Sequence, residues 1–251
     1  MLDVVPRFLV SDVDPRASLV TLPTDETHHL THVLRLGQGA EVSVFDGRGR
    51  EWLGRVASTG RRGAIVELVR ETVPLVEPSV RVTLAVGLLK GDQMDAVIRD
   101  AVMLGVSAIV PMTSAHVAVS KRAQARDAAE RWRRIAVSSA KQCRRAVVPV
   151  ISPVTAFGSV LVQGGFDGKL IAVEPAANSP QGEPHGRGRA VPPRLGTALL
   201  LIGPEGGWSS EEVEQATRAG AVRLDLGPRT LRAQSAPVVA LSSLWTIWGW
   251  T

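Results

Sequence analysis

The pattern of apolar and polar positions changes partway along this 251-residue chain. From residue 1 to about 73, short apolar runs are separated by glycine-rich turns, which is typical of a β-rich domain. From Val80 onward, strand-like runs alternate with longer amphipathic segments. The segment PLVEP at residues 74–78 separates the two patterns, because two prolines in five residues interrupt both helix and sheet. We therefore expect domains at residues 1–73 and 80–251, joined by a linker at residues 74–79.

The first domain is expected to contain four strands and one short helix. The sequences DGRG at residues 46–49 and GRRG at residues 60–63 are hairpin signals. The helix is expected to begin near Thr24, and it carries three histidines. No acid or further histidine stands at a suitable spacing beside them, so we expect no metal site there. The expected strands are residues 7–10, 41–45, 50–58 and 64–72, and the histidines are His28, His29 and His32.

The second domain is expected to be α/β, a parallel sheet with helices on both faces. The expected strands are residues 80–86, 108–112, 147–151, 169–173 and 198–202, and the expected helices are residues 92–104, 123–144, 155–161 and 237–250. The alternation stops between residues 175 and 196, where five prolines and four glycines occur. Such a composition cannot bury a core, so we expect a mobile surface loop there.

The expected strand at residues 198–202 leads into the stretch GPEGGWSSEE. Gly203 to Gly207 must form a tight turn, and glycines let backbone groups approach a ligand closely. A helix should follow, because Ser209 can cap its free N–H groups while Glu212 reaches back as a capping box. A strand end, a glycine turn and a helix N-terminus together predict a ligand cradle. The stretch lacks both phosphate-binding fingerprints, and an ordinary turn is the alternative interpretation.

Composition is that of an ordinary globular protein, with 45% hydrophobic and 21% charged residues. No apolar run approaches the ~18 residues of a membrane span, and the N-terminus does not resemble a signal peptide. We therefore expect a cytoplasmic protein with no membrane partner. The single cysteine, Cys143, permits neither an internal disulfide nor a cysteine metal cluster, so we expect no metal.

Positive charge is concentrated at residues 121–145, which carry nine basic residues and two acids. The net charge of the whole chain is only +5, so the remainder is slightly acidic. Such a concentration favours contact with an anionic partner such as nucleic acid. A solvated helix face is the alternative interpretation.

Several stretches, spread over nearly the whole chain, resemble the SPOUT class of RNA methyltransferases. Within that class they are similar to the family, the RsmE type, that methylates ring N-3 of a uridine in 16S ribosomal RNA of the small subunit. The stretches are HHLTHVLRLGQGAEVSVFDGRG at residues 28–49, LLKGDQMDAVIRDAVMLGVSAIVP at residues 88–111, RWRRIAVSSAKQCRRAVVP at residues 131–149, GPEGG at residues 203–207 and LGPRTLR at residues 226–232.

The resemblance implies a PUA-like β-barrel that contacts RNA, followed by a SPOUT domain with a C-terminal trefoil knot. It also implies S-adenosyl-L-methionine as methyl donor, and small-subunit ribosomal RNA or the assembled small subunit as partner. The donor is expected against Leu201, Ile202, Gly203, Pro204, Glu205, Gly206, Gly207, Leu226, Gly227, Arg229, Leu231 and Arg232. From the resemblance and the basic segment together, RNA is expected against Arg7, Arg35, Arg48, Arg133, Arg134, Lys141, Arg144 and Arg145.

Methyl transfer to N-3 of uridine requires in-line alignment and also removal of the N-3 proton. Arg232 is the first catalytic candidate, because a fixed cation stabilises the negative oxygen that develops on the base. Relatives usually have Leu-Arg-Thr-Glu-Thr-Ala here, whereas this chain has Gln234 in place of the acid. Gln234 can hydrogen-bond the base but cannot usefully accept its proton, and Glu205 is the alternative. The general base therefore stays unassigned.

Two further interpretations stay open. The chain could be an RNA-binding module of the same fold that has weak or lost catalysis, which the amide at Gln234 favours. It could also be a Rossmann-type nucleotide enzyme, although the missing fingerprint argues against this. In every case a homodimer is expected, because Trp245, Trp248 and Trp250 cluster near the C-terminus and SPOUT proteins are usually dimers.

Overall fold

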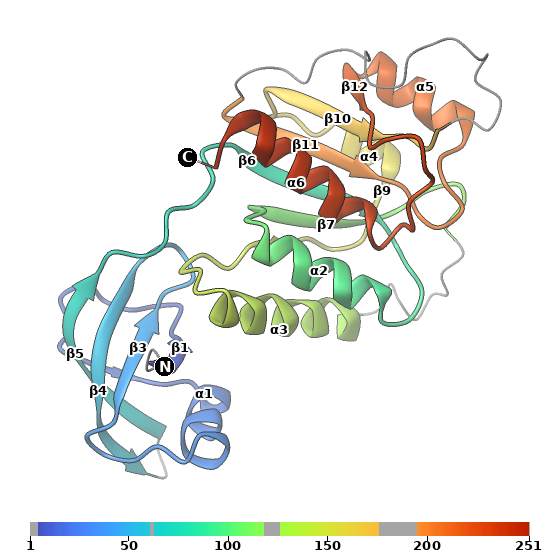
Figure 1. Ribbon diagram of the computed structural model, residues 1–251. Helices are drawn as coiled ribbons and strands as arrows, with labels where there is room; N and C mark the ends of the chain where they lie inside the picture. Colours follow the sequence, from blue (N-terminus) through green and yellow to red (C-terminus); the bar gives the residue numbers. More distant parts are fainter. Residues whose placement is uncertain (1–4, 61–62, 118–125, 176–194, 251) are drawn as a thin grey trace. The chain divides into compact units, whose positions relative to one another are not determined.

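The structure, a computed structural model, describes residues 5–60, 63–117, 126–175 and 195–250. It divides into two compact units (Figure 1). The first unit is Met1–Val76 with Ala140–Val148, and the second is Glu77–Ser139 with Pro149–Thr251. Most of the loop expected at residues 175–196, the start of the helix expected at residue 123, and Lys121 and Arg122 lie outside the described residues.

The first unit is built on a five-stranded sheet in the order β1-β3-β4-β5-β2. β3 (Glu41–Phe45), β4 (Glu51–Gly60) and β5 (Gly63–Thr72) form an antiparallel meander, and β1 (Arg7–Leu9) joins β3 in parallel. These four expected strands are confirmed. β2 (Leu19–Thr21), which pairs with β5, was not predicted.

A short helix closes one side of this sheet. α1 (Thr24–His28) begins at the expected residue and continues into a π-helical turn, η1 (His29–Val33). Leu30 is fully buried with sheet residues such as Phe8 and Val66, and these side chains form the core of the unit. The backbone of residues 146–148 bonds to the β3–β4 turn, with Val148 N donating to Gly47 O at 2.9 Å, which explains why residues 140–148 belong to this unit.

The second unit contains a seven-stranded sheet whose described strands all pair in parallel, as expected. The order is β12-β10-β11-β6-β7-β8, and β9 also pairs with β7. The strands are β6 (Arg81–Gly87), β7 (Ala108–Thr113), β8 (Val150–Ile151), β9 (Thr155–Ala156), β10 (Gly168–Ala172), β11 (Thr197–Ile202) and β12 (Ala221–Leu224). Two expectations are corrected. The strand expected at residues 147–151 is only β8, and the helix expected at residues 155–161 begins at Phe157, because residues 155–156 form β9. β12 was not predicted.

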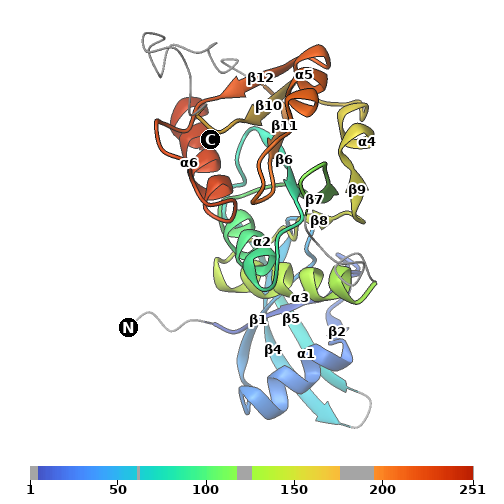
Figure 2. The same ribbon diagram turned by 90° about the vertical axis from the view of Figure 1, so that its right-hand side faces the viewer.

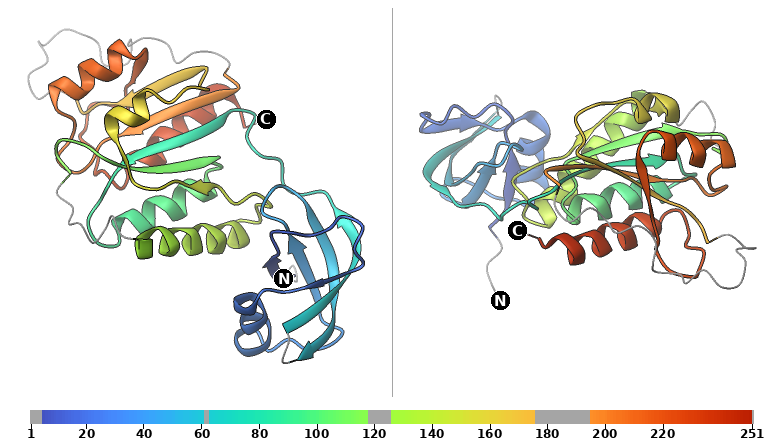
Figure 3. Two further views of the ribbon diagram at one scale, coloured as in Figure 1. Left: turned by 180° about the vertical axis from the view of Figure 1, so that it is seen from behind. Right: turned by 90° about the horizontal axis from the view of Figure 1, so that it is seen from above.

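Helices cover both faces of this sheet (Figure 2). α2 (Gln93–Met103) and α6 (Ala236–Trp248) pack together on one face, and α4 (Phe157–Leu161) and α5 (Ser210–Arg218) lie on the other (Figure 3). α3 (Arg126–Gln142) is tied to α2 by an ion pair between Arg131 and Asp95. Among the described residues, no helix is both long enough and apolar enough to cross a membrane.

The sheet order brings three strand ends to one edge. β12, β10 and β11 are neighbours that run in the same direction, so their carboxyl ends lie side by side. The segments that leave these ends are residues 173–175 after β10, residues 203–209 after β11 and residues 225–235 after β12. Open α/β sheets bind ligands at such edges.

Candidate functional site

The loop after β11 has a backbone conformation that requires glycine. Gly207 has a φ of +68°, which L side chains rarely adopt, and its N–H donates to Pro204 O at 3.0 Å. A Cβ on Gly203 would lie 3.2 Å from the indole ring of Trp208. That indole Nε1 in turn donates to Ala172 O at 2.8 Å. The loop is therefore folded against the end of β10.

The helix that follows begins as expected. Ser209 is the N-cap of α5, where its Oγ accepts from Glu212 N at 3.2 Å and its own N donates to Glu212 Oε2 at 3.0 Å. The predicted capping box is confirmed. The other carboxylate oxygen of Glu212 accepts from Ala115 N at 2.8 Å, and His116 Nδ1 lies 3.0 Å from Gly206 O. The segment after β7 thus supports the loop from the side.

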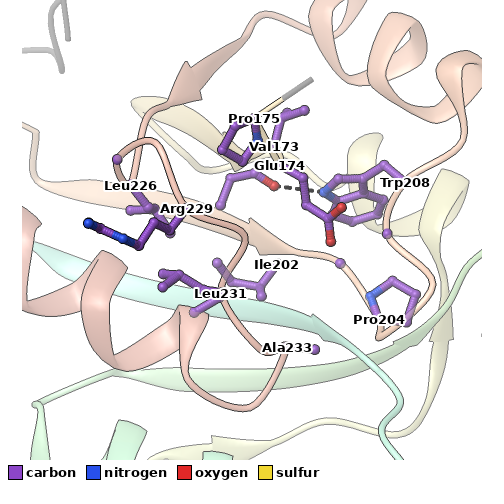
Figure 4. A pocket seen from close by; sticks show the side chains of 15 residues that line it. Val173, Glu174, Pro175, Ile202, Pro204, Trp208, Leu226, Arg229, Leu231 and Ala233 are labelled. Carbon is purple, nitrogen blue, oxygen red and sulfur yellow. Dashed lines mark hydrogen bonds between the residues drawn. The ribbon is translucent and has the colours of Figure 1, made fainter. Parts of the chain in front are cut away.

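The three strand-end segments enclose a pocket with a volume of about 480 Å³, its open mouth included (Figure 4). Ile202, Leu226 and Leu231 give it apolar walls, and the glycines of the loops expose bare backbone to it. Figure 4 shows the carboxylate of Glu174 turned into the pocket beside Trp208. Apolar walls with a few polar groups are typical of a small-molecule site.

Most of the residues expected against the donor line this pocket. These are Ile202, Gly203, Pro204, Gly207, Leu226, Gly227, Arg229 and Leu231. Leu201 does not, because its side chain is fully buried in the core under α4 and α5. Gly206 instead contacts His116, and Glu205 and Arg232 line a second, adjoining hollow.

Sequence reasoning missed the part of the pocket that comes from the end of β10 and the start of α6. The missed residues are Ala172, Val173, Glu174, Pro175, Trp208, Ala233 and Ala236. A signal for the first four was available, since a parallel strand was expected at residues 169–173 and neighbouring strands end at the same edge. No pattern indicated that Trp208 would turn toward β10.

The second hollow brings together the three expected catalytic residues. Arg232, Gln234 and Glu205 all line it, and Glu205 Oε1 accepts from Lys90 N at 3.2 Å. Its volume is about 750 Å³, with open solvent included. The two hollows share three lining residues, Glu174, Leu231 and Ala233. A molecule in one hollow and a molecule in the other therefore meet at this boundary.

Three cations expected to contact RNA are instead engaged inside the first unit. The Arg7 side chain is 7% exposed, pairs with Glu51 at 2.9 Å, and donates to the carbonyl oxygens of Ala140 and Arg145 at 3.0 Å. Lys141 pairs with Glu26, which is also buried, and Arg145 is 6% exposed. Because Arg7 and Lys141 are paired with acids of the unit and Arg145 is buried, we do not propose RNA contacts for these three residues.

The other five expected RNA contacts are exposed. Arg133 and Arg134 lie on α3, and Arg35, Arg48 and Arg144 lie in the first unit. Among the described residues, the Arg48 side chain pairs with exposed Asp12 alone, at 3.4 Å. Arg35 and Arg144 have backbone φ values of 54° and 65°, which are uncommon for residues other than glycine. These side chains are free to reach an anionic partner.

The three histidines of the first unit make ring contacts with one another and with Phe8. His28 stacks on His32 with ring centroids 4.6 Å apart, and His29 meets Phe8 edge-on at 6.0 Å. Within the described ranges, no group of three or more histidine, cysteine or acidic residues is arranged to hold a metal ion.

Comparison with known proteins shows to which protein family the chain belongs. Residues 76–245 match the model of an RNA methyltransferase domain, and residues 22–69 match that of an RNA methyltransferase PUA domain. Ribosomal RNA small subunit methyltransferase E of Bacillus subtilis is 31% identical over 91% of this chain and 90% of its own length. This chain belongs to the ribosomal RNA small subunit methyltransferase E family. The first unit therefore carries a PUA-like domain and the second an RNA methyltransferase domain, as the sequence motifs predicted.

Other methyltransferase E proteins extend the likeness. The Synechocystis protein is 32% identical over 95% of this chain and 76% of its own length. A crystal structure of the Neisseria gonorrhoeae methyltransferase E, bound to S-adenosyl methionine, is 29% identical and aligns with a TM-score of 0.81 over 97% of this chain and 98% of that one. The methyltransferase E fold thus extends through both units.

Proposed function

We propose that this chain is an enzyme that transfers a methyl group from S-adenosylmethionine to ring N-3 of a uridine in 16S ribosomal RNA. The observation that carries this proposal is a glycine-lined pocket at three strand ends, adjoined by a hollow that holds Arg232, in a chain of the methyltransferase E family. The donor would lie in the pocket and the uracil ring in the adjoining hollow.

The pocket residues fit this donor. Adenine is flat and apolar on its faces, which suits the side chains of Ile202, Leu226 and Leu231. Its ring nitrogens and the methionine part need hydrogen bonds, which bare backbone at Gly203 and Gly227 is open to make. When bound, the donor supplies a methyl group on a positively charged sulfur. The loops that line the pocket would hold the donor with its methyl group toward the second hollow and would keep water away from it.

Arg232 has a clear task in the second hollow. As N-3 of uracil gives up its proton and attacks, negative charge develops on the neighbouring ring oxygens. A guanidinium fixed beside the ring stabilises that charge, and Gln234 can donate a hydrogen bond to the same edge of the base.

RNA phosphates are proposed to bind the five exposed arginines, namely Arg35, Arg48, Arg133, Arg134 and Arg144. Such contacts position the RNA without reading its bases. The partner is small-subunit ribosomal RNA, either free or in the assembled subunit, and a cytoplasmic location follows from that partner. We also propose that the C-terminal segment forms the trefoil knot of the class, supported by the way residues 226–236 close the pocket against residues 202–208.

A homodimer that uses α6 is proposed as well. Trp245 needs no partner copy to bury it, since its indole Nε1 donates to Leu104 O at 2.7 Å and its ring stacks on Trp250. Ile247 and Trp250 remain 54% and 48% exposed, and they are the apolar side chains that a partner copy would cover. Sedimentation of a single-chain species at micromolar concentration would contradict this part of the proposal.

The experiment that tests the activity is calorimetry with S-adenosylmethionine, followed by methyl transfer to small-subunit RNA and to assembled subunits. Saturable donor binding and methyl transfer to either substrate are expected. The second candidate function is an RNA-binding module without catalysis, which the amide at Gln234 favours. RNA binding without donor binding would establish that function instead.

A further inference from the structure

Glu174 is placed where the two hollows meet. Of the three residues that line both, Glu174, Leu231 and Ala233, Glu174 has the only titratable side chain. Both its carboxylate oxygens lie 3.6 Å from where a Cβ on Gly207 would stand, so the carboxylate faces the donor loop. Within the described part of the chain, this carboxylate makes no hydrogen bond or ion pair. It is an uncommitted anion at the boundary.

The chemistry needs a proton acceptor at that same boundary. If the methyl group sits in the first pocket and uracil in the second, N-3 must face the first pocket to reach the methyl carbon. The N-3 proton then points toward the same region. A general base must lie within hydrogen-bond reach of that proton, which restricts the base to residues that line both hollows.

We propose that Glu174 is the general base that accepts the N-3 proton, an inference that rests on the proposed methyl transfer. The N-3–H bond breaks and its proton goes to the Glu174 carboxylate. The electron pair left on N-3 forms the new bond to the methyl carbon, while the bond from that carbon to sulfur breaks and its pair stays on sulfur. The positive sulfur and the negative carboxylate both become neutral, so the step needs no further reactant.

The other candidates fit this role less well. Glu205 lines only the second hollow, and one of its oxygens is held by Lys90 N. Gln234 is an amide with no basic atom. The charged groups that face Glu174 across the two hollows are Arg229, Arg232 and Glu205. With Arg232 assigned to the ring oxygen and Glu174 to the proton, the chain completes the reaction without an acid at position 234.

The test compares Glu174→Gln, Glu174→Asp and the control Glu211→Gln in the full chain. Glu211 is an exposed acid on α5 whose carboxylate accepts a hydrogen bond from Gln215 Nε2 at 3.2 Å. The measurements are donor affinity by calorimetry and the single-turnover rate of methyl transfer from pH 5 to pH 10. For Glu174→Gln we expect a rate lowered about 10²- to 10⁴-fold with donor affinity nearly unchanged. The deficit should shrink at alkaline pH, where the uracil loses its N-3 proton unaided, and Glu174→Asp should recover part of the rate.

The outcomes separate this inference from the proposed function. If the parent protein neither binds donor nor methylates RNA, the proposed function itself fails. If the parent is active and Glu174→Gln is equally fast, only the role of Glu174 is overturned. If Glu174→Gln loses donor affinity as much as it loses rate, the carboxylate holds the cationic part of the donor, and the general-base role is again overturned.

Discussion

The loop at residues 203–207 and the basic segment at residues 126–145 both stand out in the sequence, yet the structure uses them in different ways. The loop forms the cradle that its glycines and the Ser209 cap predict. The cations of the basic segment diverge. Arg133 is exposed, whereas Arg131 pairs with Asp95 and Lys141 pairs with Glu26.

The difference comes from how far apart in the sequence the residues lie that determine each conformation or contact. A positive φ at Gly207 and a capping box at Ser209 are fixed by residues a few positions apart. A long cationic side chain goes wherever an acid or a free carbonyl is close in space. The acid that binds Lys141 is 115 residues away in the sequence. Backbone motifs can therefore be predicted from neighbouring residues in the sequence. The partner of a charged side chain can be identified only from the folded structure.

The largest effect is expected from Arg7, the clearest case of a charge used inside the protein. Arg7→Ala removes the donor to three carbonyl groups and the counter-charge of the largely buried Glu51, which keeps the neutral Ser43 hydroxyl as a donor. The free energy of unfolding should fall by about 3–5 kcal/mol, because an uncompensated buried charge remains. Urea unfolding measures this loss.

Arg48→Ala is the matched control for Arg7→Ala, because Arg48 is 72% exposed and its one ion pair within the described chain is with exposed Asp12. Its effect on stability should stay below about 1 kcal/mol. Equal and small effects of the two substitutions would mean that Arg7 is an ordinary surface cation, and the contrast between the two regions would disappear.

A second test addresses the loop. Gly207→Val places a β-branched side chain at a φ of +68° and directs it toward Glu174 and the pocket. Strain of about 1–3 kcal/mol is expected, and donor affinity should fall roughly 10- to 100-fold by calorimetry. RNA binding should persist. Gly164→Val is the control, since a Cβ there meets open space and its φ is ordinary. If a folded Gly207→Val protein binds the donor as tightly as the parent does, the loop is an ordinary turn that does not contact the donor.

A third test asks whether the exposed arginines hold RNA. Reversal of Arg133, Arg134 and Arg144 to glutamate should weaken binding to all RNAs alike and reduce the salt dependence by about one unit per lost phosphate contact. Donor binding should not change. Reversal of Arg99, Arg218 and Arg223, which are also exposed, changes the net charge equally and serves as the control. The same loss in both triple variants would assign the effect to overall charge.

The smallest effect is expected at the start of β11, the strand whose other end leads into the loop at residues 203–207. Backbone N–H groups of Thr197 and Gly196 donate to the Asp167 carboxylate at 2.9 and 2.8 Å, and they hold the pKa of Asp167 below its usual value. Because the folded-state pKa is the lower one, this stabilisation is complete above the unfolded pKa of about 4 and is lost as the pH falls through the folded pKa. Asp167→Asn should lower the Tm by a few degrees at most at pH 7, and the difference should vanish at low pH. Asp12→Asn should show no such pH-dependent difference.

Much of the fold was predictable because its signals are local. The confirmed strands and helices follow from periodicity, and the end of α2 follows from Gly105, whose φ is +83°. β2 and β12 were not predicted, and they are defined by their pairing with β5 and β10, which only the folded chain provides. The membership of residues 140–148 in the first unit was also not predicted, because it depends on carbonyl groups that Arg7 finds only in the folded protein.

The site was predictable where a motif described the backbone and less so where side chains converge from separate strands. The glycines at 203, 207 and 227 line the pocket as expected. Of the two expected strand residues, Ile202 lines the pocket and Leu201 does not, because successive residues of a strand face opposite sides and the Leu201 side chain enters the core. Glu174 was missed because no motif surrounds it. Only the adjacency of β10 and β11 brings it to the boundary of the two hollows.

The most direct test of the account is mass spectrometry of 16S ribosomal RNA after incubation with the protein and S-adenosylmethionine. We expect one added methyl group on ring N-3 of a uridine, present with the parent protein and strongly reduced with Gly207→Val. An RNA that gains no methyl group, although the protein is folded and binds it, would contradict the claim that the pocket at the strand ends serves methyl transfer.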